Sequence, residues 1–95
     1  MIGFVQGKSP EFLSNWMKRQ AYIALGMLMS ECAYRHIDSC PMEGFDPAKF
    51  DEVLGLSQKG FESVVLCPVG YRAKDDMYAG LKKVRFDAKE VLISL

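Results

Sequence analysis

The sequence predicts an α+β fold, and three features carry that prediction. Two capping residues followed by proline, Ser9-Pro10 and Asp46-Pro47, each indicate the start of a helix. A long apolar stretch follows the first pair, as in a buried helix. The run Val64-Val65-Leu66-Cys67, after the second pair, is typical of a strand covered on both faces. The 95 residues allow one domain at most.

The first predicted helix begins at Pro10 and remains helix-compatible to about Tyr34 or Arg35. Its later part, residues 21–29, is apolar on every face and so needs cover on every face. Some 25 helical residues span roughly 38 Å, whereas a compact domain of this size is only about 30 Å across. We therefore expect missing sequence or a second subunit to cover the helix. Gly26 fits a close approach of two helices.

The remaining elements follow in order. Residues 36–40 predict a short extended segment, and 46–55 predict a short helix that Gly55 ends. Residues 61–71 predict a central strand in which Pro68 weakens the pairing. Residues 72–77 predict a charged surface loop, because charged side chains predominate there.

The C-terminus completes the expected elements. The apolar and polar side chains of residues 84–88 alternate, and 91–95 predict a final strand. An apolar strand that ends the chain exposes a free edge, which favours pairing with another chain. Together with the long apolar helix, it predicts an intertwined oligomer.

Composition excludes several function classes. Twelve basic residues balance twelve acidic ones, so no net field favours nucleic acid or an anionic membrane. The longest apolar run is about half a membrane span, and no signal-peptide pattern begins the chain. Cys32, Cys40 and Cys67 are scattered, which argues against a disulfide framework or a zinc site and predicts buried or half-buried thiols. We expect a soluble cytoplasmic protein without a bound metal.

The chain has no pattern for nucleophilic or metal catalysis, and no side chain is singled out as catalytic. His36, the one histidine, lies where the long helix should end, as a C-terminal cap or a solvated surface residue. Chemistry that needs few side chains is chemistry that a cofactor performs.

The segment Pro41-Met42-Glu43-Gly44-Phe45, after a long helix and before Lys83-Val84-Arg85, resembles the nitroreductase family of flavoproteins. Single pieces such as Gly70-Tyr71-Arg72 are weak, but Pro41-Met42-Glu43-Gly44-Phe45 between a long helix and a later K-x-R is specific. The match covers nearly the whole chain. The matching segments are Trp16, Arg19 to Gly26, Ile37 to Asp46, Leu54 to Leu56, Gly60, Val64-Val65, Val69 to Arg72 and Lys83-Val84-Arg85.

This resemblance implies an α/β sandwich in which two subunits build two FMN sites at their interface. The long helix would form the centre of the homodimer, and the C-terminal strand would cross to the partner's sheet. Residues 1–95 would be a partial nitroreductase domain, its C-terminal half, because family members are about twice as long. Their N-terminal half supplies further flavin contacts, so the FMN site here would be incomplete.

The resemblance also implies the site residues. Pro41, Met42, Glu43 and Gly44 would pass along the flavin ring, with the amides of Glu43 and Gly44 near N5 and O4. Lys83 and Arg85 would bind the FMN phosphate. The alternatives are a surface turn for residues 41–45 and solvated charges at Lys83 and Arg85.

The reaction that the family implies is two-electron transfer from NADH or NADPH, by way of FMN, to a nitroaromatic, a quinone or a similar small-molecule acceptor. Activity of the 95 residues alone is uncertain. One alternative is a non-catalytic dimerisation module or inactive fragment of such an enzyme. Another is an unrelated small α/β binding protein.

Overall fold

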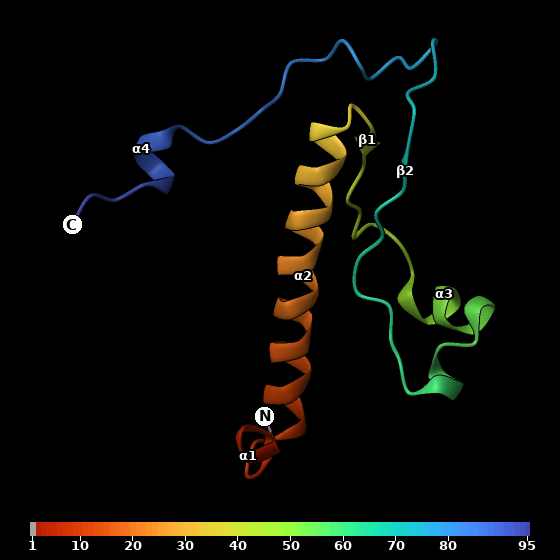
Figure 1. Ribbon diagram of the computed structural model, residues 1–95, viewed down its shortest axis with the longest axis vertical. Coiled ribbons are helices and arrows are strands. Elements are labelled where there is room, and N and C mark those ends of the chain that lie inside the picture. The colour runs from red at the N-terminus through yellow and green to blue at the C-terminus, as the bar shows by residue number, and fades with distance from the viewer. Residues whose placement is uncertain (1) are drawn as a thin grey trace.

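The computed structural model describes residues 2–95, and the long helix α2 (Pro10–Tyr34) dominates it. The Ser9 hydroxyl accepts a hydrogen bond from the Phe12 amide at 3.1 Å, and Pro10 begins the helix, as predicted. The helix runs most of the length of the molecule, with β1 (Asp38–Ser39), β2 (Val69–Gly70) and α3 (Pro47–Leu54) along one side of it and α4 (Ala88–Val91) on the other side (Figure 1).

The C-terminal end of α2 is closed by a left-handed residue. His36 has a φ of 57°, and its amide donates to the Ala33 carbonyl at 3.2 Å. The Ile37 amide donates to the Cys32 carbonyl at 2.9 Å. These two bonds form a Schellman-type cap that turns the chain back along the helix. The predicted position of His36, exposed at a helix end, is confirmed.

A two-stranded antiparallel ladder lies beside that end of α2. Strand β1 (Asp38–Ser39) pairs with β2 (Val69–Gly70), with Asp38 opposite Gly70. The same register continues to a separate bridge between Met42 and Leu66. Regular pairing is interrupted at Pro68, as predicted, because proline has no amide hydrogen to donate.

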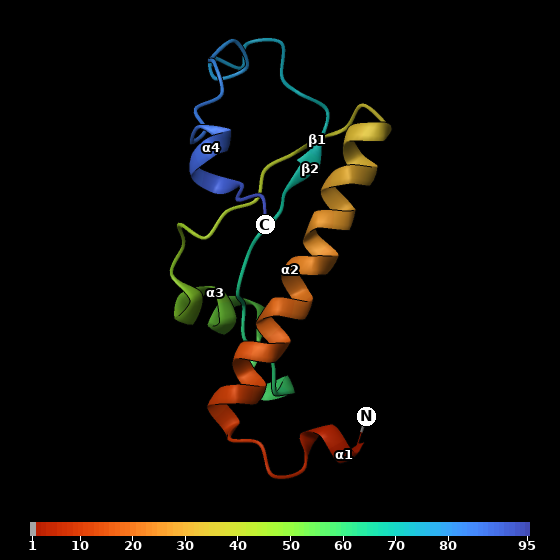
Figure 2. The same cartoon turned by 90° about the vertical axis from the view of Figure 1, so that its left-hand side faces the viewer.

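The predicted central strand over residues 61–71 is wrong in its extent and cover. Only Val69–Gly70 forms a regular strand, and the side chains of residues 64–67 are half-buried. A strand buried on both faces needs elements on both sides. Residues 2–95 supply α2 on one side and nothing equivalent on the other (Figures 1 and 2).

Helix α3 (Pro47–Leu54) forms as predicted, with Asp46 as its N-cap and Gly55 at a φ of 63° as its C-cap. A single turn of 3-10 helix, η1 (Ser57–Lys59), follows it. The Asp51 carboxylate is buried and accepts a hydrogen bond from the Ser63 amide at 2.9 Å. That bond ties α3 to the segment that leads to Leu66.

At the other end of the molecule, α1 (Ile2–Val5) folds against the start of α2. The Phe4 ring lies 6.1 Å from the Phe12 ring and 5.4 Å from Trp16, centre to centre. The Lys8 ammonium lies 5.0 Å from the centre of the Phe12 ring. This small aromatic cluster is the main apolar contact at the base of α2.

The predicted C-terminal strand does not form within the described residues, and its pairing with a second chain stays a prediction. Residues 88–91 form one helical turn, α4 (Ala88–Val91), and neither 84–88 nor 92–95 pairs with another strand within the described residues. A strand needs a ladder partner, and this segment runs away from α2 into open space (Figure 1). The exposed loop over residues 72–77 is confirmed.

The described residues form almost no core of their own. Cys32 is the one buried apolar side chain among them. The radius of gyration is 17.6 Å, against about 12 Å for a compact chain of this length. The accessible surface is 8892 Å², against roughly 5,500 Å² for a folded monomer of this mass. The chain therefore exposes more surface than a compact monomer of its mass, and this surface is available for contact with another polypeptide segment or subunit.

The helices of the described chain, α1 to α4, do not have the character of membrane spans. None of them, within residues 2–95, is both long and apolar enough to cross a membrane.

Candidate functional site

The loop of residues 41–45 is held at its start by backbone hydrogen bonds. The Met42 amide donates to the Leu66 carbonyl at 2.8 Å, and the Leu66 amide donates to the Met42 carbonyl at 2.9 Å. At its other end the Phe45 ring meets the Phe50 ring of α3 edge-on, 5.5 Å between centres. The loop is therefore pinned on both sides of Glu43 and Gly44.

Between these anchors the loop exposes two amide donors. The structure gives the N–H groups of Glu43 and Gly44 no acceptor within residues 2–95. The Glu43 carbonyl, by contrast, accepts from the Phe45 amide at 2.9 Å. A side chain at Gly44 would meet no atom of the chain within 4 Å, so nothing in the fold requires glycine there. Both features suit a group from outside the chain that accepts hydrogen bonds and approaches the backbone closely.

A polar seam on α2 faces this loop and the segment after α3. Its members, Ser14, Lys18 and Tyr22, recur every four residues and so share one face of the helix. Ser14 donates to the Glu62 carboxylate at 3.4 Å, and the Lys18 ammonium pairs with it at 3.3 Å. The Tyr22 hydroxyl donates to the Glu43 carboxylate. The seam thus connects α2 to the loop through side chains.

A bidentate ion pair closes the ladder at the opposite end. Arg72 donates from Nε to Asp38 Oδ2 at 2.6 Å and from a terminal nitrogen to Oδ1 at 3.0 Å. The hydrogen bonds from Arg72 hold the pKa of the Asp38 carboxyl below its usual range, and the same bonds raise the pKa of Arg72. The pair joins β1 to the residues just after β2.

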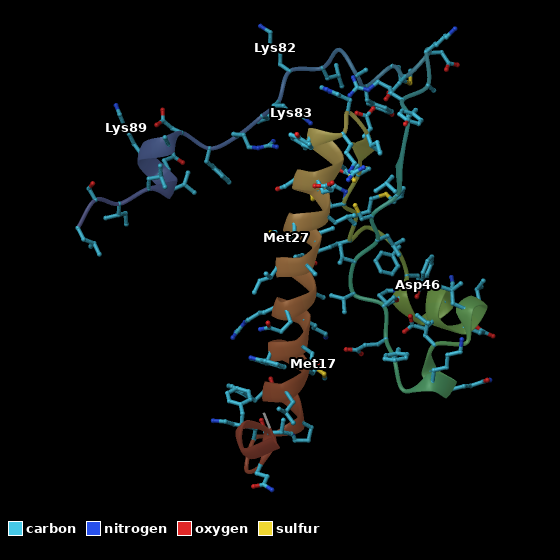
Figure 3. All side chains as sticks on the ribbon, viewed as in Figure 1. Met17, Met27, Asp46, Lys82, Lys83 and Lys89 are labelled. Carbon is cyan, nitrogen blue, oxygen red and sulfur yellow. The ribbon has the colours of Figure 1, made fainter. Side chains whose placement is uncertain are left out.

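The two predicted phosphate ligands lie in different surroundings. Lys83 lines an open hollow of about 380 Å³ together with Cys40, the residue that precedes the loop, and Arg72. Figure 3 shows Lys83 on the segment between β2 and α4. The Arg85 guanidinium donates to the neighbouring Val84 carbonyl at 2.8 Å. Thus Lys83 lies near the start of the loop, and no contact joins Arg85 to the loop within residues 2–95.

The thiols follow the sequence expectation in part. Cys32 is buried and Cys67 is half-buried, but Cys40 is exposed. Cys40 differs because it lies in the ladder at the rim of the hollow, where no other element of the described chain covers it.

Sequence reasoning had assigned no role to Tyr22 and no partner to Asp38. A signal for Tyr22 exists in the four-residue spacing of Ser14, Lys18 and Tyr22. The Asp38–Arg72 pair depends on the register of the ladder and has no local signal.

The part of the chain that contains α2, the loop of residues 41–45 and the ladder is similar to known proteins. A family model described as "Nitroreductase family" matches residues 2–71. The chain is 38% identical over 77 residues to the oxygen-insensitive NAD(P)H nitroreductase of Salmonella typhimurium, an alignment covering 81% of the chain and 36% of that protein.

Two further relatives show the same pattern. The chain is 38% identical over 84 residues to a putative NAD(P)H nitroreductase of Staphylococcus haemolyticus, and 38% identical over 81 residues to the major NAD(P)H-flavin oxidoreductase of Aliivibrio fischeri. Each alignment covers 84% of the chain and 37% of the relative. The chain spans little more than a third of the length of these relatives. The matched span includes α2, the loop of residues 41–45 and the ladder, and the chain belongs to the nitroreductase family.

Proposed function

We propose that this chain is part of an FMN-dependent oxidoreductase that transfers two electrons from NAD(P)H to nitroaromatics, quinones or similar acceptors. The observation that carries the proposal is the loop of residues 41–45, whose Glu43 and Gly44 amides have no acceptor within residues 2–95. The names of the relatives, NAD(P)H nitroreductase and NAD(P)H-flavin oxidoreductase, support it.

In this proposal the protein binds and orients while the cofactor supplies the redox chemistry. Residues 41–44 pass along the flavin ring, and the Glu43 and Gly44 amides donate to its acceptor atoms. Fixed amide dipoles stabilise one charge distribution without reorganising, which is how preorganised sites work. The Met42–Leu66 hydrogen bonds and the Phe45–Phe50 ring contact hold the two ends of the loop and so fix these amides.

Lys83 and Arg85 bind the FMN phosphate in the same proposal. Both are exposed cations on the segment that follows β2, and the guanidinium offers a fork that matches two phosphate oxygens. Lys83 already lies beside Cys40 at the start of the loop. Arg85 has to leave the Val84 carbonyl to take part.

The chain assembles as a homodimer in this proposal, because its uncovered surface is too large and too apolar for a monomer. Ile23 and Met27 of α2 are 64% and 71% exposed. They lie on the opposite side of the helix from the polar seam. A side chain at Gly26 would meet no atom of its own chain, which leaves room for a second helix. The surface excess of roughly 3,400 Å² exceeds the ~800 Å² that each partner of a standard interface buries.

The C-terminal segment has the character of an arm that crosses to the second copy. Its apolar side chains are exposed, and Leu92, which ends α4, has an extended backbone conformation. An extended segment of this kind gains both hydrogen bonds and apolar burial when it pairs with a foreign edge. The exposed apolar side chains are those of Val84, Phe86, Val91, Leu92, Ile93 and Leu95.

A titration with FMN and with riboflavin tests the proposal. We expect the purified chain to quench FMN fluorescence and to bleach bound FMN when NADPH is added. Replacing both Lys83 and Arg85 with alanine removes charge-assisted bonds worth about 1.5–3 kcal/mol each. FMN affinity therefore falls at least tenfold while riboflavin affinity stays unchanged.

The matched control is Lys82→Ala, which removes one positive charge from the same segment (Figure 3). It should leave FMN affinity within about twofold, since an isolated surface charge contributes little. Equal losses for FMN and riboflavin would remove the phosphate role. A colourless dimer with no flavin affinity would favour the non-catalytic dimerisation module.

A further inference from the structure

Tyr22 and Glu43 join the middle of α2 to the exposed stretch of the loop. The Tyr22 hydroxyl donates to the Glu43 carboxylate across 21 residues of sequence. Tyr22 is 38% exposed, so the contact lies at the surface rather than in packed interior. It is the one side-chain hydrogen bond that the structure gives to residues 41–45 within the described chain.

This contact acts where the loop is otherwise unsupported. The Met42–Leu66 bridge fixes the backbone before Glu43, and the Phe45–Phe50 contact fixes it afterwards. Between them, the hydrogen bond to the Glu43 side chain is the one contact within residues 2–95 by which another element restrains the loop. A loop residue without such a handle samples several rotamers and backbone dihedrals, and restraining it early avoids the ordering cost on binding.

Peptide geometry links the Glu43 side chain to the two free donors. The Glu43 carbonyl and the Gly44 N–H belong to one planar peptide, so they point in opposite directions. The Glu43 carbonyl accepts from the Phe45 amide, which directs the Gly44 N–H away from the body of the loop. The φ and ψ angles of Glu43 therefore set the direction of the Gly44 N–H relative to the Glu43 N–H, and the held carboxylate restrains those angles.

The charges around the contact explain why a hydroxyl is needed. Lys18, Tyr22, Glu43 and Glu62 line one hollow of about 500 Å³ beneath the loop. The Lys18 ammonium is paired with Glu62 at 3.3 Å. Glu43 is the second carboxylate in a hollow with one cation, and the Tyr22 hydroxyl is its donor. The uncharged Tyr22 hydroxyl donates a hydrogen bond to the Glu43 carboxylate without placing a second positive charge beside the Glu43 and Gly44 amides.

We propose that Tyr22 is a positioning residue that aims the Glu43 and Gly44 amides at the flavin by holding the Glu43 carboxylate. This inference rests on the proposed function, and it adds a residue of α2 that does not itself touch the cofactor. Its consequence is that removing one hydroxyl oxygen alters the loop without altering the helix.

The test compares Tyr22→Phe with Tyr34→Phe. Tyr34 is the last residue of the same helix, and it is 84% exposed. We expect Tyr22→Phe to lower FMN affinity about tenfold, the fold-change that loss of one hydrogen bond to a charged group gives. Helix content and the thermal midpoint should match wild type, and Tyr34→Phe should change neither binding nor stability.

Amide NMR on the flavin-free chain separates this inference from the proposed function. Tyr22→Phe should shift the Glu43 and Gly44 amide resonances, whereas Tyr34→Phe should not. Glu43→Gln retains an oxygen that accepts from Tyr22, although without the charge, so its loss of FMN affinity should be smaller than that of Glu43→Ala. Glu43→Ala should match Tyr22→Phe, and the double variant Tyr22→Phe with Glu43→Ala should lose no more than either alone.

FMN binding and the amide resonances test the proposed function and the role of Tyr22 separately. Failure of the wild-type chain to bind FMN removes the proposed function, while the amide shifts still decide whether Tyr22 positions the loop. Unchanged Glu43 and Gly44 resonances in Tyr22→Phe overturn the positioning role, even where FMN binds. Additive losses in the double variant overturn it as well.

Discussion

Met42 and Leu66 exchange two backbone hydrogen bonds, one of 2.8 Å and one of 2.9 Å, although 24 positions separate them in the sequence. The bridge lies at the end of the β1–β2 ladder and directly before Glu43. It therefore fixes the point from which the two free amides project, and the loop geometry depends on the Leu66 segment as much as on the loop residues themselves.

Replacing Leu66 with proline should release the loop. Proline removes the amide that donates to the Met42 carbonyl, at a cost of about 0.5–1.5 kcal/mol for the lost bond. We expect faster hydrogen exchange at the Met42 amide and weaker FMN binding. Val65→Pro is the control, because the structure gives the Val65 amide no acceptor within residues 2–95. Similar exchange at Met42 in both variants would contradict a role for the bridge.

The Asp38–Arg72 pair predicts an acid-sensitive ladder. Hydrogen bonds from Arg72 lower the pKa of the Asp38 carboxyl in the folded chain. The Asp38–Arg72 pair therefore stabilises the folded ladder fully above pH ~3.9, the usual pKa of aspartate. This stabilisation is lost as the pH falls through the lowered pKa of Asp38 in the folded chain.

A carbon-13 titration of the Asp38 carboxyl measures this. The inflection should lie below that of an unstructured aspartate, and Arg72→Ala should move it upward. Asp38→Asn should abolish the acid-induced shift at the Gly70 amide, which pairs with residue 38. An inflection that is the same in Arg72→Ala and wild type would contradict the assignment.

Gly44 and Gly55 should respond differently to valine. Gly55 has a φ of 63° at the end of α3, a conformation that costs a β-branched residue about 1–3 kcal/mol. Gly44 lacks a positive φ, and a side chain there meets open space. Gly55→Val should lower the thermal midpoint, whereas Gly44→Val should leave it unchanged and weaken FMN binding. Unchanged FMN affinity in Gly44→Val would defeat the loop assignment.

Local signals in the sequence predicted the helices well. The Ser9-Pro10 and Asp46-Pro47 pairs set the starts of α2 and α3, and both caps have the expected hydrogen bonds. Gly55 set the end of α3 for the same reason, since only short-range backbone geometry is involved. The family resemblance is confirmed, and most of its motifs lie within residues 2–71, the span that the family model matches. Lys83-Val84-Arg85 lies outside that span, and its role stays a prediction.

Long-range features were predicted less well. The apolar run of residues 64–67 and the C-terminal residues 91–95 both indicated strands, yet neither forms one in residues 2–95. A strand is defined by its neighbours, and the neighbours that these segments require are not supplied by the described chain. The Tyr22–Glu43 contact was missed for a similar reason, because it depends on how α2 lies against a loop 21 residues away.

Light scattering tests most directly whether a second copy covers the side of α2 that carries Ile23 and Met27. We predict twice the mass of one chain at micromolar concentration, with FMN strengthening the association. Met27→Glu should shift the equilibrium toward monomer by at least tenfold, because it places a charge on a side chain that is 71% exposed in one chain and that the proposed dimer would bury. Asn15→Glu, an exposed position away from Ile23 and Met27, should have no such effect. A wild-type chain with the mass of one copy at every concentration, with or without FMN, would contradict the account.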